Sequence, residues 1–569
     1  MIAPRIRAKT RALPLALALA GGLSAYAAHA AEEPKYGGNL EIINYYPTLN
    51  AQTWDPADYV WKQNHDLGTI YELLFVADLS KAKSRGGEHL FEADAWLPTD
   101  AIKGELAESW QVLEDPLRVE IKLRKGVRFP GKEGVMAARD LTAQDVVYSF
   151  ERTNASARKV QGYFDYIDRV EAVDDHTVIF HFNKFNAEWD YRFGYGYYAQ
   201  IYPKEVVEKG ISDWRNANGT GPFNIAEYVQ GNAATYKKNP DYWGEATIDG
   251  KSYKLPFIDS FVYRTVKDES TQHSLLRSGK VDILENIRWS AVEELKKSAP
   301  DLQWRRSLMY TGYLLAMRND AKPFDDVRVR RAMNMAVNKK EIIDALYEGN
   351  AEMLAFPLHP DYQGYYKPLE EMPDSVKELF DYNPEKAKKL LAEAGYPKGF
   401  SFKAQVCACN APHMELMPLL SAYFEQIGVK MEIVPMEYAA FFSSMNASTH
   451  TAGYMMSKGH SNPTTALRNS YTKNDPWNTA KWHNEEFEKG MQEVFLERDE
   501  SVRHKKMQEL TRMALDDAPY VVLPTPYYYR AWWPWVKNYG GELRAGAVRP
   551  GPIYAQIWID QDLKKKMGY

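Results

Sequence analysis

The chain has 569 residues, enough for about two to four domains of ordinary size. It contains 71 Lys and Arg against 76 Asp and Glu, and this balance argues against a nucleic-acid partner, which needs a basic surface. Two cysteines exclude a disulfide-rich scaffold and a four-cysteine zinc site. The 38 Tyr and 15 Trp combine an apolar face with a polar group, which suits a binding surface.

The first 30 residues have the layout of a secretory signal. Basic residues lie between Arg5 and Arg11, an apolar run covers Leu13–Ala20, and Ala28 and Ala30 are the small residues of a cleavage site. The run is shorter than the roughly 20 residues of a membrane span, and no cysteine near the cut could carry a lipid. We expect cleavage before Ala31 and an exported protein without membrane insertion.

In the first half of the mature chain, alternating apolar residues predict strands at about 40–44, 119–123 and 178–182. Thr142 and Asp145 have the spacing of a capping box and predict a helix start. A joint between domains is expected near Gly219–Pro222.

The second half carries the clearest pattern. Asn383 and Pro384 predict a helix start, and Gly395 predicts its end. A strand at 400–406, a helix through 417–424 that ends at Gly428, and a strand at 429–433 follow. Helices that alternate with strands at this spacing predict an α/β layer. A second joint is expected at Ala518–Pro519.

Motifs for catalysis are weak. Gly126–Lys132 has the spacing of a phosphate loop, but Glu133 stands where magnesium needs Ser or Thr, so a turn between strands is favoured. Gly194–Ala199 resembles a dinucleotide fingerprint without a βαβ frame. Cys407 and Cys409 could form a redox or soft-metal site or be two small core side chains, and the latter is favoured. We predict no enzyme, no metal and no cofactor.

Eleven segments, taken in order, resemble the family 5 extracellular solute-binding proteins, the oligopeptide- and dipeptide-type receptors of bacterial ABC importers. The resemblance covers nearly the whole mature chain. The segments are Tyr36–Gly38, Trp54–Pro56, Ile70–Leu74, Leu106–Trp110, Leu123–Phe129, Leu141–Ser149, Gly219–Phe223, Asn239–Trp243, Ser278–Ile283, Pro323–Ala332 and Tyr382–Leu391.

The resemblance implies an α/β, two-lobed periplasmic-binding-protein fold of the large peptide-binding type. An extra domain is inserted in the first lobe, and the ligand cleft lies between the lobes. The implied parts are a signal peptide at 1–30, lobe one at 31–72, 201–305 and 516–569, the inserted domain at 73–200, and lobe two at 306–515.

The implied function is capture of a peptide or peptide-like solute by hinge closure, with delivery to the subunits of an ABC permease by a monomeric receptor. The alternative within the fold is a non-peptide solute such as an oligosaccharide, an opine-like compound or a metal chelate. A secreted hydrolase is less favoured because no activated nucleophile is evident, and a holdase-like chaperone is not separated from a transport receptor by sequence.

The resemblance places ligand contacts after the first strand and in lobe two, where aromatic faces could stack on the solute and amides could bond to it. For Trp477 and Trp482, core packing is the equal alternative. Tyr527–Tyr529 and Trp532–Trp535 are expected to pack at the hinge or the surface. The expected ligand-binding residues are Asn44, Tyr45, Tyr46, Tyr454, Ser457, His460, Asn462, Trp477, Asn478 and Trp482.

One segment departs from the family's peptide binders, which carry W-x-A-D-Y-x-D-P and pair its first aspartate with the ligand's α-ammonium. This chain reads Met456-Ser-Lys-Gly-His-Ser-Asn-Pro463, so Gly459 stands at that aspartate's position unless a loop of different length shifts the register. Lys458 and His460 favour an anionic or neutral group there, although Glu437 could supply an acid from elsewhere. We predict a ligand that does not rely on a free N-terminal ammonium.

Overall fold

A computed structural model describes residues 32–43, 53–160, 162–459 and 462–569. The chain divides into two units, Met1–Pro34 and Lys35–Tyr569, and the architecture below is that of the second. The expected signal peptide, at 1–30, lies outside the described residues. Within the described residues, no helix has the length and apolar character that crossing a membrane requires.

The largest sheet has eight strands, in the order β10-β11-β14-β1-β15-β23-β16, with β18 also paired to β23. Strand β1 is parallel to β14 and β15, whereas β23 is antiparallel to β15 and β16. Helices α4 (Glu269–Arg277) and α5 (Trp289–Ser298) follow β14 and β15. The strands are β1 (Asn39–Ile43), β10 (Phe223–Val229), β11 (Ala233–Lys238), β14 (Ser260–Arg264), β15 (Ile283–Ile287), β16 (Gln303–Leu308), β18 (Ala351–Glu352) and β23 (Thr525–Trp532).

A five-stranded sheet, ordered β20-β19-β21-β17-β22, holds the helix–strand pattern predicted for the second half. Its strands are β17 (Gly312–Met317), β19 (Ser401–Cys407), β20 (Lys430–Met436), β21 (Gly453–Lys458) and β22 (Tyr520–Val522). Its main helices are α6 (Val327–Met335), α9 (Pro384–Glu393), α10 (Ala411–Glu425), α11 (Tyr438–Asn446), α12 (Pro463–Tyr471), α13 (Glu485–Leu496) and α14 (Glu500–Asp516). Asn383 caps α9 as predicted, by accepting from Lys386 N at 2.9 Å.

A four-stranded antiparallel sheet, β4-β5-β9-β8, lies within the expected inserted domain. The predicted alternation is confirmed, because Ile121 faces Val178 across β5 and β9 and both side chains are buried. Helix α2 (Ala143–Asn154) packs against β8 and β9, and Asp145 accepts from Thr142 N at 2.9 Å, as the capping box predicts. The strands are β4 (Ala107–Glu114), β5 (Leu117–Leu123), β8 (Ile167–Asp174) and β9 (Thr177–Phe182).

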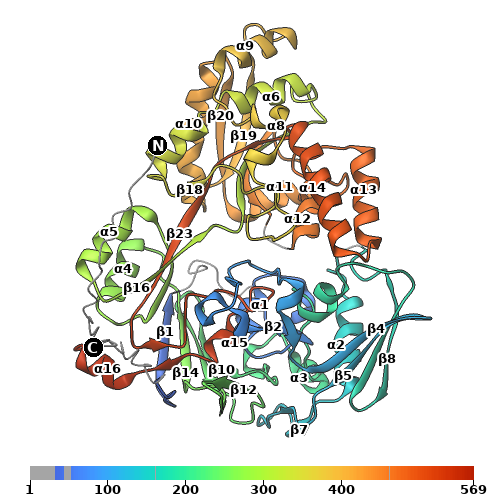
Figure 1. Cartoon of the computed structure of the whole chain (residues 1–569), viewed down its shortest axis with the longest axis vertical. Helices are drawn as coiled ribbons and strands as arrows, with labels where there is room; N and C mark the ends of the chain where they lie inside the picture. The colour runs from blue at the N-terminus through green and yellow to red at the C-terminus, as the bar shows by residue number, and fades with distance from the viewer. Residues whose placement is uncertain (1–31, 44–52, 161, 460–461) are drawn as a thin grey trace, which may run out of the picture. The chain divides into compact units, whose positions relative to one another are not determined.

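The apolar residues form two separate cores, which is the basis of a two-lobed fold. One core joins the eight-stranded and four-stranded sheets, and the other lies around the five-stranded sheet. The chain leaves the eight-stranded sheet after Leu308 and enters the other at Gly312; it returns between Val522 and Thr525. In Figure 1, β23 carries the returning chain back into the eight-stranded sheet, where it pairs with β16.

The two joints expected from sequence lie next to strands. Gly219–Pro222 directly precedes β10, and Gly221 N donates to Ile70 O at 2.8 Å. Ala518 and Pro519 directly precede β22, so the change of sheet comes a few residues later, at Leu523 and Pro524.

The aromatic cluster at the end of β23 is part of a core. Trp533 and Trp535 are buried and stack with ring centroids 4.7 Å apart. Their indole N–H groups donate to Leu276 O at 2.9 Å and to Asp282 Oδ1 at 2.7 Å, respectively. They anchor the returning chain in the first core.

Candidate functional site

The carboxyl ends of the parallel strands define the candidate site, because ligands of open α/β sheets bind outside that edge. In the five-stranded sheet, β19, β20 and β21 run parallel, and each is followed by a helix. Asn410, Glu437 and Asn462 cap α10, α11 and α12, respectively, by accepting from backbone N–H groups of the first turn. Three helix N-termini therefore gather at one edge of lobe two.

The corresponding edge of the eight-stranded sheet adjoins this one. Arg288 follows β15 directly and makes a bidentate ion pair with Glu415 of α10, at 3.0 and 2.7 Å. The next residue, Trp289, belongs to the second core and donates its indole N–H to Leu346 O at 3.0 Å. The carboxyl end of β15 and the first turns of α10 thus meet beside the crossings of the chain.

His413, in the first turn of α10, is a buried titratable group at this edge. Its ring meets the Tyr313 ring edge to face at 4.8 Å, and Tyr313 OH lies 3.4 Å from Tyr528 OH. The His413 side chain is 3% exposed, and its Nε2 has no hydrogen-bond partner among the residues that the structure describes. Loss of hydration on burial lowers the His413 pKa to about 3, so the ring is neutral at ordinary pH.

Cys407 and Cys409 are not two separate small core side chains, as was expected, because they form a disulfide. Strand β19 ends at Cys407, and the chain turns through Ala408 and Cys409 into the N-cap of α10. The turn places the two sulfurs together, which an extended strand through both residues could not do. The disulfide closes the corner between β19 and α10 at the candidate site.

Lys458, the last residue of β21, is buried, at 2% exposure. Its ammonium group donates to Trp477 O and, at 3.0 Å, to Tyr520 OH, and it lies 4.7 Å from the centre of the Tyr520 ring. Burial lowers the Lys458 pKa well below its ordinary value, with Lys481 adding to the effect and Asp475 opposing it. The lysine ties β21 to β22 inside the lobe.

Gly459 cannot be replaced by a residue with a side chain without strain. Its φ is +98°, and a Cβ there would come within 2.9 Å of Pro357 O. Its carbonyl accepts from Tyr362 OH at 3.1 Å, and the Tyr362 ring packs on Trp96 at 5.3 Å. The backbone at this position is therefore built around glycine, and no carboxylate is available from it.

Four of the expected ligand-binding residues, Asn44, Tyr45, Tyr46 and His460, lie outside the described residues. Tyr454 lies in the second core, stacked on Phe441 at 4.1 Å, and its hydroxyl donates to Phe441 O at 2.9 Å. Ser457 is half-buried on β21. The described contacts of Tyr454 are those of a core residue.

Asn462, Asn478 and Trp482 also have structural contacts. Asn462 Oδ1 accepts from Thr465 N at 2.8 Å, as the N-cap of α12. Asn478 is fully buried and donates to Trp482 O at 2.8 Å, and the Trp482 indole donates to Asp517. Trp477 is half-buried, 6.1 Å from the Phe442 ring. For Trp482, the structure gives the core packing that was the alternative to ligand contact.

Arg288, Glu415 and His413 were not among the residues expected at the site from the sequence. Arg288 and Glu415 are 127 residues apart, so no local pattern could pair them. The available signal was positional for His413 and Glu415, which come shortly after the predicted strand at 400–406, at the end where α/β sheets bind ligands. Arg288 follows β15, a strand that was not predicted.

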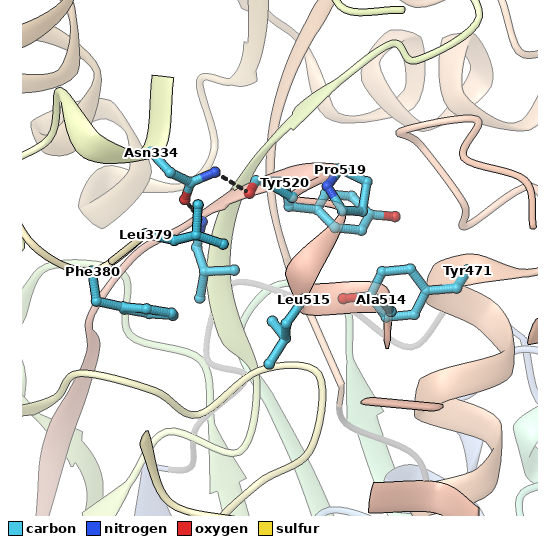
Figure 2. A pocket seen from close by; sticks show the side chains of 10 residues that line it. Asn334, Leu379, Phe380, Tyr471, Ala514, Leu515, Pro519 and Tyr520 are labelled. Carbon is cyan, nitrogen blue, oxygen red and sulfur yellow. Dashed lines mark hydrogen bonds between the residues drawn. The ribbon is translucent and has the colours of Figure 1, made fainter. Parts of the chain in front are cut away.

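A cavity inside lobe two is too small to hold a solute. It lies between α6, α14 and β22, and Figure 2 shows Asn334, Tyr471 and Tyr520 around it. Asn334 donates to Tyr520 O at 2.9 Å beside the cavity. Its volume of about 10 Å³ holds about one water molecule. Within the part of the chain that the structure describes, no group of three or more His, Cys, Asp or Glu is placed to hold a metal.

Comparison with known proteins agrees with this architecture. Residues 101–478 match the model of the bacterial extracellular solute-binding proteins, family 5 Middle. The chain is 29% identical over 465 residues to heme-binding protein A of Haemophilus influenzae, covering 77% of this chain and 81% of that protein. It is 28% identical to the dipeptide-binding protein of Escherichia coli over 75% of this chain and 81% of that protein.

A solved structure shows the same fold. The periplasmic binding protein DppA of Helicobacter pylori, in complex with the peptide STSA, superposes with a TM-score of 0.74 at 24% identity. The match covers 93% of this chain and 99% of that one. With its two α/β lobes, its inserted four-stranded domain and a family match over most of its length, the chain belongs to the family 5 bacterial extracellular solute-binding proteins.

Proposed function

We propose that the chain is a periplasmic receptor that captures a peptide or peptide-like solute between its lobes and delivers it to an ABC permease. One observation carries the proposal. The ligand-binding edges of the two sheets meet beside the two places where the chain passes from one sheet to the other, and the Arg288–Glu415 ion pair joins these edges. Relatives named for dipeptide and heme binding support a solute receptor. The chain acts as a monomer and is not an enzyme in this proposal.

The proposed parts keep the boundaries expected from sequence: a signal peptide at 1–30, lobe one at 31–72, 201–305 and 516–569, an inserted domain at 73–200, and lobe two at 306–515. The two crossings near 309–311 and 523–524 form the hinge. The expected ligand-binding residues outside the described ranges, Asn44–Tyr46 and His460, remain part of the proposed site.

We further propose that the solute lacks, or does not use, a free N-terminal ammonium. Gly459 offers no carboxylate, and the buried amine of Lys458 beside it is bonded to Trp477 O and Tyr520 OH inside the lobe. Removing one partner of a buried charge pair costs about 2–5 kcal/mol, so an unmodified peptide would lose much of its anchor here. A peptide with a blocked amine, or a peptide-like solute without one, fits this edge better.

Two measurements test the proposed function. Mass spectrometry of native protein purified from its own periplasm should release a small solute, and calorimetry should then show that the solute binds reversibly and without turnover. Hydrolysis of peptides or esters by the purified protein would instead support an enzyme. Calorimetry with matched free and N-acetylated peptides tests the second proposal, which fails if acetylation abolishes tight binding.

A further inference from the structure

A buried hydrogen bond joins the inserted domain to lobe two. Glu188 follows β9, and Thr465 is the third residue of α12. Thr465 Oγ1 donates to Glu188 Oε1 at 3.0 Å. The two residues are 4% and 8% exposed, so water does not compete for this bond in the arrangement that the structure shows.

The charge of Glu188 is held in place from within its own domain. Arg192 donates from Nε and Nη2 to Glu188 Oε2, at 3.0 and 2.8 Å, and from Nη1 to Tyr163 O at 2.6 Å. One carboxylate oxygen is therefore fixed by Arg192, and the other points to α12. A helix N-terminus attracts negative charge, and Thr465 also gives its N–H to the N-cap Asn462 at 2.8 Å.

Three further contacts join the inserted domain and lobe two near this bond. Ala187 N donates to Phe495 O, at the end of α13, at 2.8 Å. Arg498, in the turn between α13 and α14, lies over the Phe185 ring at 4.7 Å and donates to Glu114 of β4. The segment 185–188 thus meets lobe two along a continuous line, with the Glu188–Thr465 bond as its buried polar member.

We propose that Glu188 and Thr465 are positioning residues for solute capture, which close lobe two onto the inserted domain without touching the solute. The inference rests on the proposed function only in its account of what closure achieves. The bond's partners belong to different lobes, so the bond breaks when lobe two and the inserted domain move apart at this interface. A contact made only in the closed state raises the closed fraction, and apparent affinity scales with that fraction.

The test measures closure in the absence of solute. Thr99 and Glu500 meet at the exposed rim of the same interface, at 3.1 Å, and would be replaced as the pair Thr99→Cys and Glu500→Cys. Both native cysteines are in a disulfide, so a short bis-maleimide reacts with the introduced thiols. The rate of intramolecular cross-linking then reports the closed fraction, even where that fraction is small.

In this background, Thr465→Val keeps the shape of the side chain and removes the hydroxyl. We expect cross-linking to slow about tenfold, since a hydrogen bond to a charged group contributes more than a neutral one. Thr465→Ser restores the hydroxyl and should restore most of the rate. The neighbouring buried Thr464 provides the matched control, because the structure gives its side chain no bond to Glu188; Thr464→Val should keep the original rate.

Equal rates for the parent and Thr465→Val would overturn the proposal, as would a slow Thr465→Ser or an equally slow Thr464→Val. A parent that does not cross-link would overturn it as well, because lobe two and the inserted domain would then not reach this arrangement. Should Thr465→Val fail to fold, Thr465→Ala replaces it, with the thermal unfolding profile as the check. A wrong proposed function would give a different result: the protein would hold no solute, while the parent and Thr465→Ser would still cross-link faster than Thr465→Val.

Discussion

Acidification should destabilise the protein through buried His413, and replacing this residue should remove a calculable part of the effect. The ring has a pKa near 6.5 in an unfolded chain and about 3 when folded. Between these values the unfolded state binds more protons, so stability is full above pH 6.5 and is lost as pH falls toward 3. At pH 5 the unfolding free energy is lower by about 2 kcal/mol, because pH 5 lies roughly 1.5 units below the unfolded pKa and each unit corresponds to about 1.36 kcal/mol.

The assay is urea unfolding at pH 7 and pH 5. The difference in unfolding free energy between the two pH values should be about 2 kcal/mol smaller in His413→Phe than in the parent. The figure depends little on the folded pKa as long as that value lies below about 4. His483 is exposed, so His483→Gln should keep the parental difference. A His413→Phe protein with the full parental pH dependence would refute the reasoning.

Three other changes have defined outcomes. Gly459→Asp should lower the unfolding free energy by about 1–2 kcal/mol, since a residue with a side chain is strained at a φ of +98°. An unchanged unfolding free energy, measured by urea unfolding, would contradict this prediction. Alkylation of the unfolded, unreduced protein should add no mass, and two adducts should appear after reduction of Cys407–Cys409; adducts before reduction would mean that the disulfide is absent. Arg549 pairs with buried Glu105 at 2.8 and 2.9 Å, so Arg549→Met should lower the unfolding free energy by about 3–5 kcal/mol, and adding Glu105→Gln should recover part of this loss. An Arg549→Met protein with the parental unfolding free energy would contradict this prediction.

Local patterns in the sequence predicted several of the helices and strands. Alternation at 119–123 and 178–182 predicted β5 and β9, and the caps at Thr142 and Asn383 predicted the starts of α2 and α9. These signals are local because burial on one face of a strand or helix imposes a fixed period on the residues that form it. The order of family motifs added the two-lobed architecture, which no single pattern could supply.

The same local reasoning was incomplete at the corner after β19. The prediction of two small core side chains at Cys407 and Cys409 did not consider that β19 ends at Cys407 and that the chain turns there into the N-cap of α10 at Asn410. Aromatic residues were equally ambiguous, because a tryptophan side chain can either stack on a ligand or pack in a core, and Trp482 packs in the second core. The chemical type of a side chain limits the contacts that it can make, and its neighbours in the fold decide which of these contacts it makes.

The sequence by itself determined the fold class, the caps and the absence of an acid at Gly459. Only the tertiary structure decided which distant residues meet: Arg288 with Glu415, Glu188 with Thr465, and His413 with Tyr313. Two of these pairs are separated by more than a hundred residues, and their free energies depend on the low dielectric and the fixed geometry that burial provides. The tertiary structure also decided that Gly459 must remain glycine, because the constraint comes from the approach of Pro357 O, a neighbour in space that is a hundred residues away in sequence.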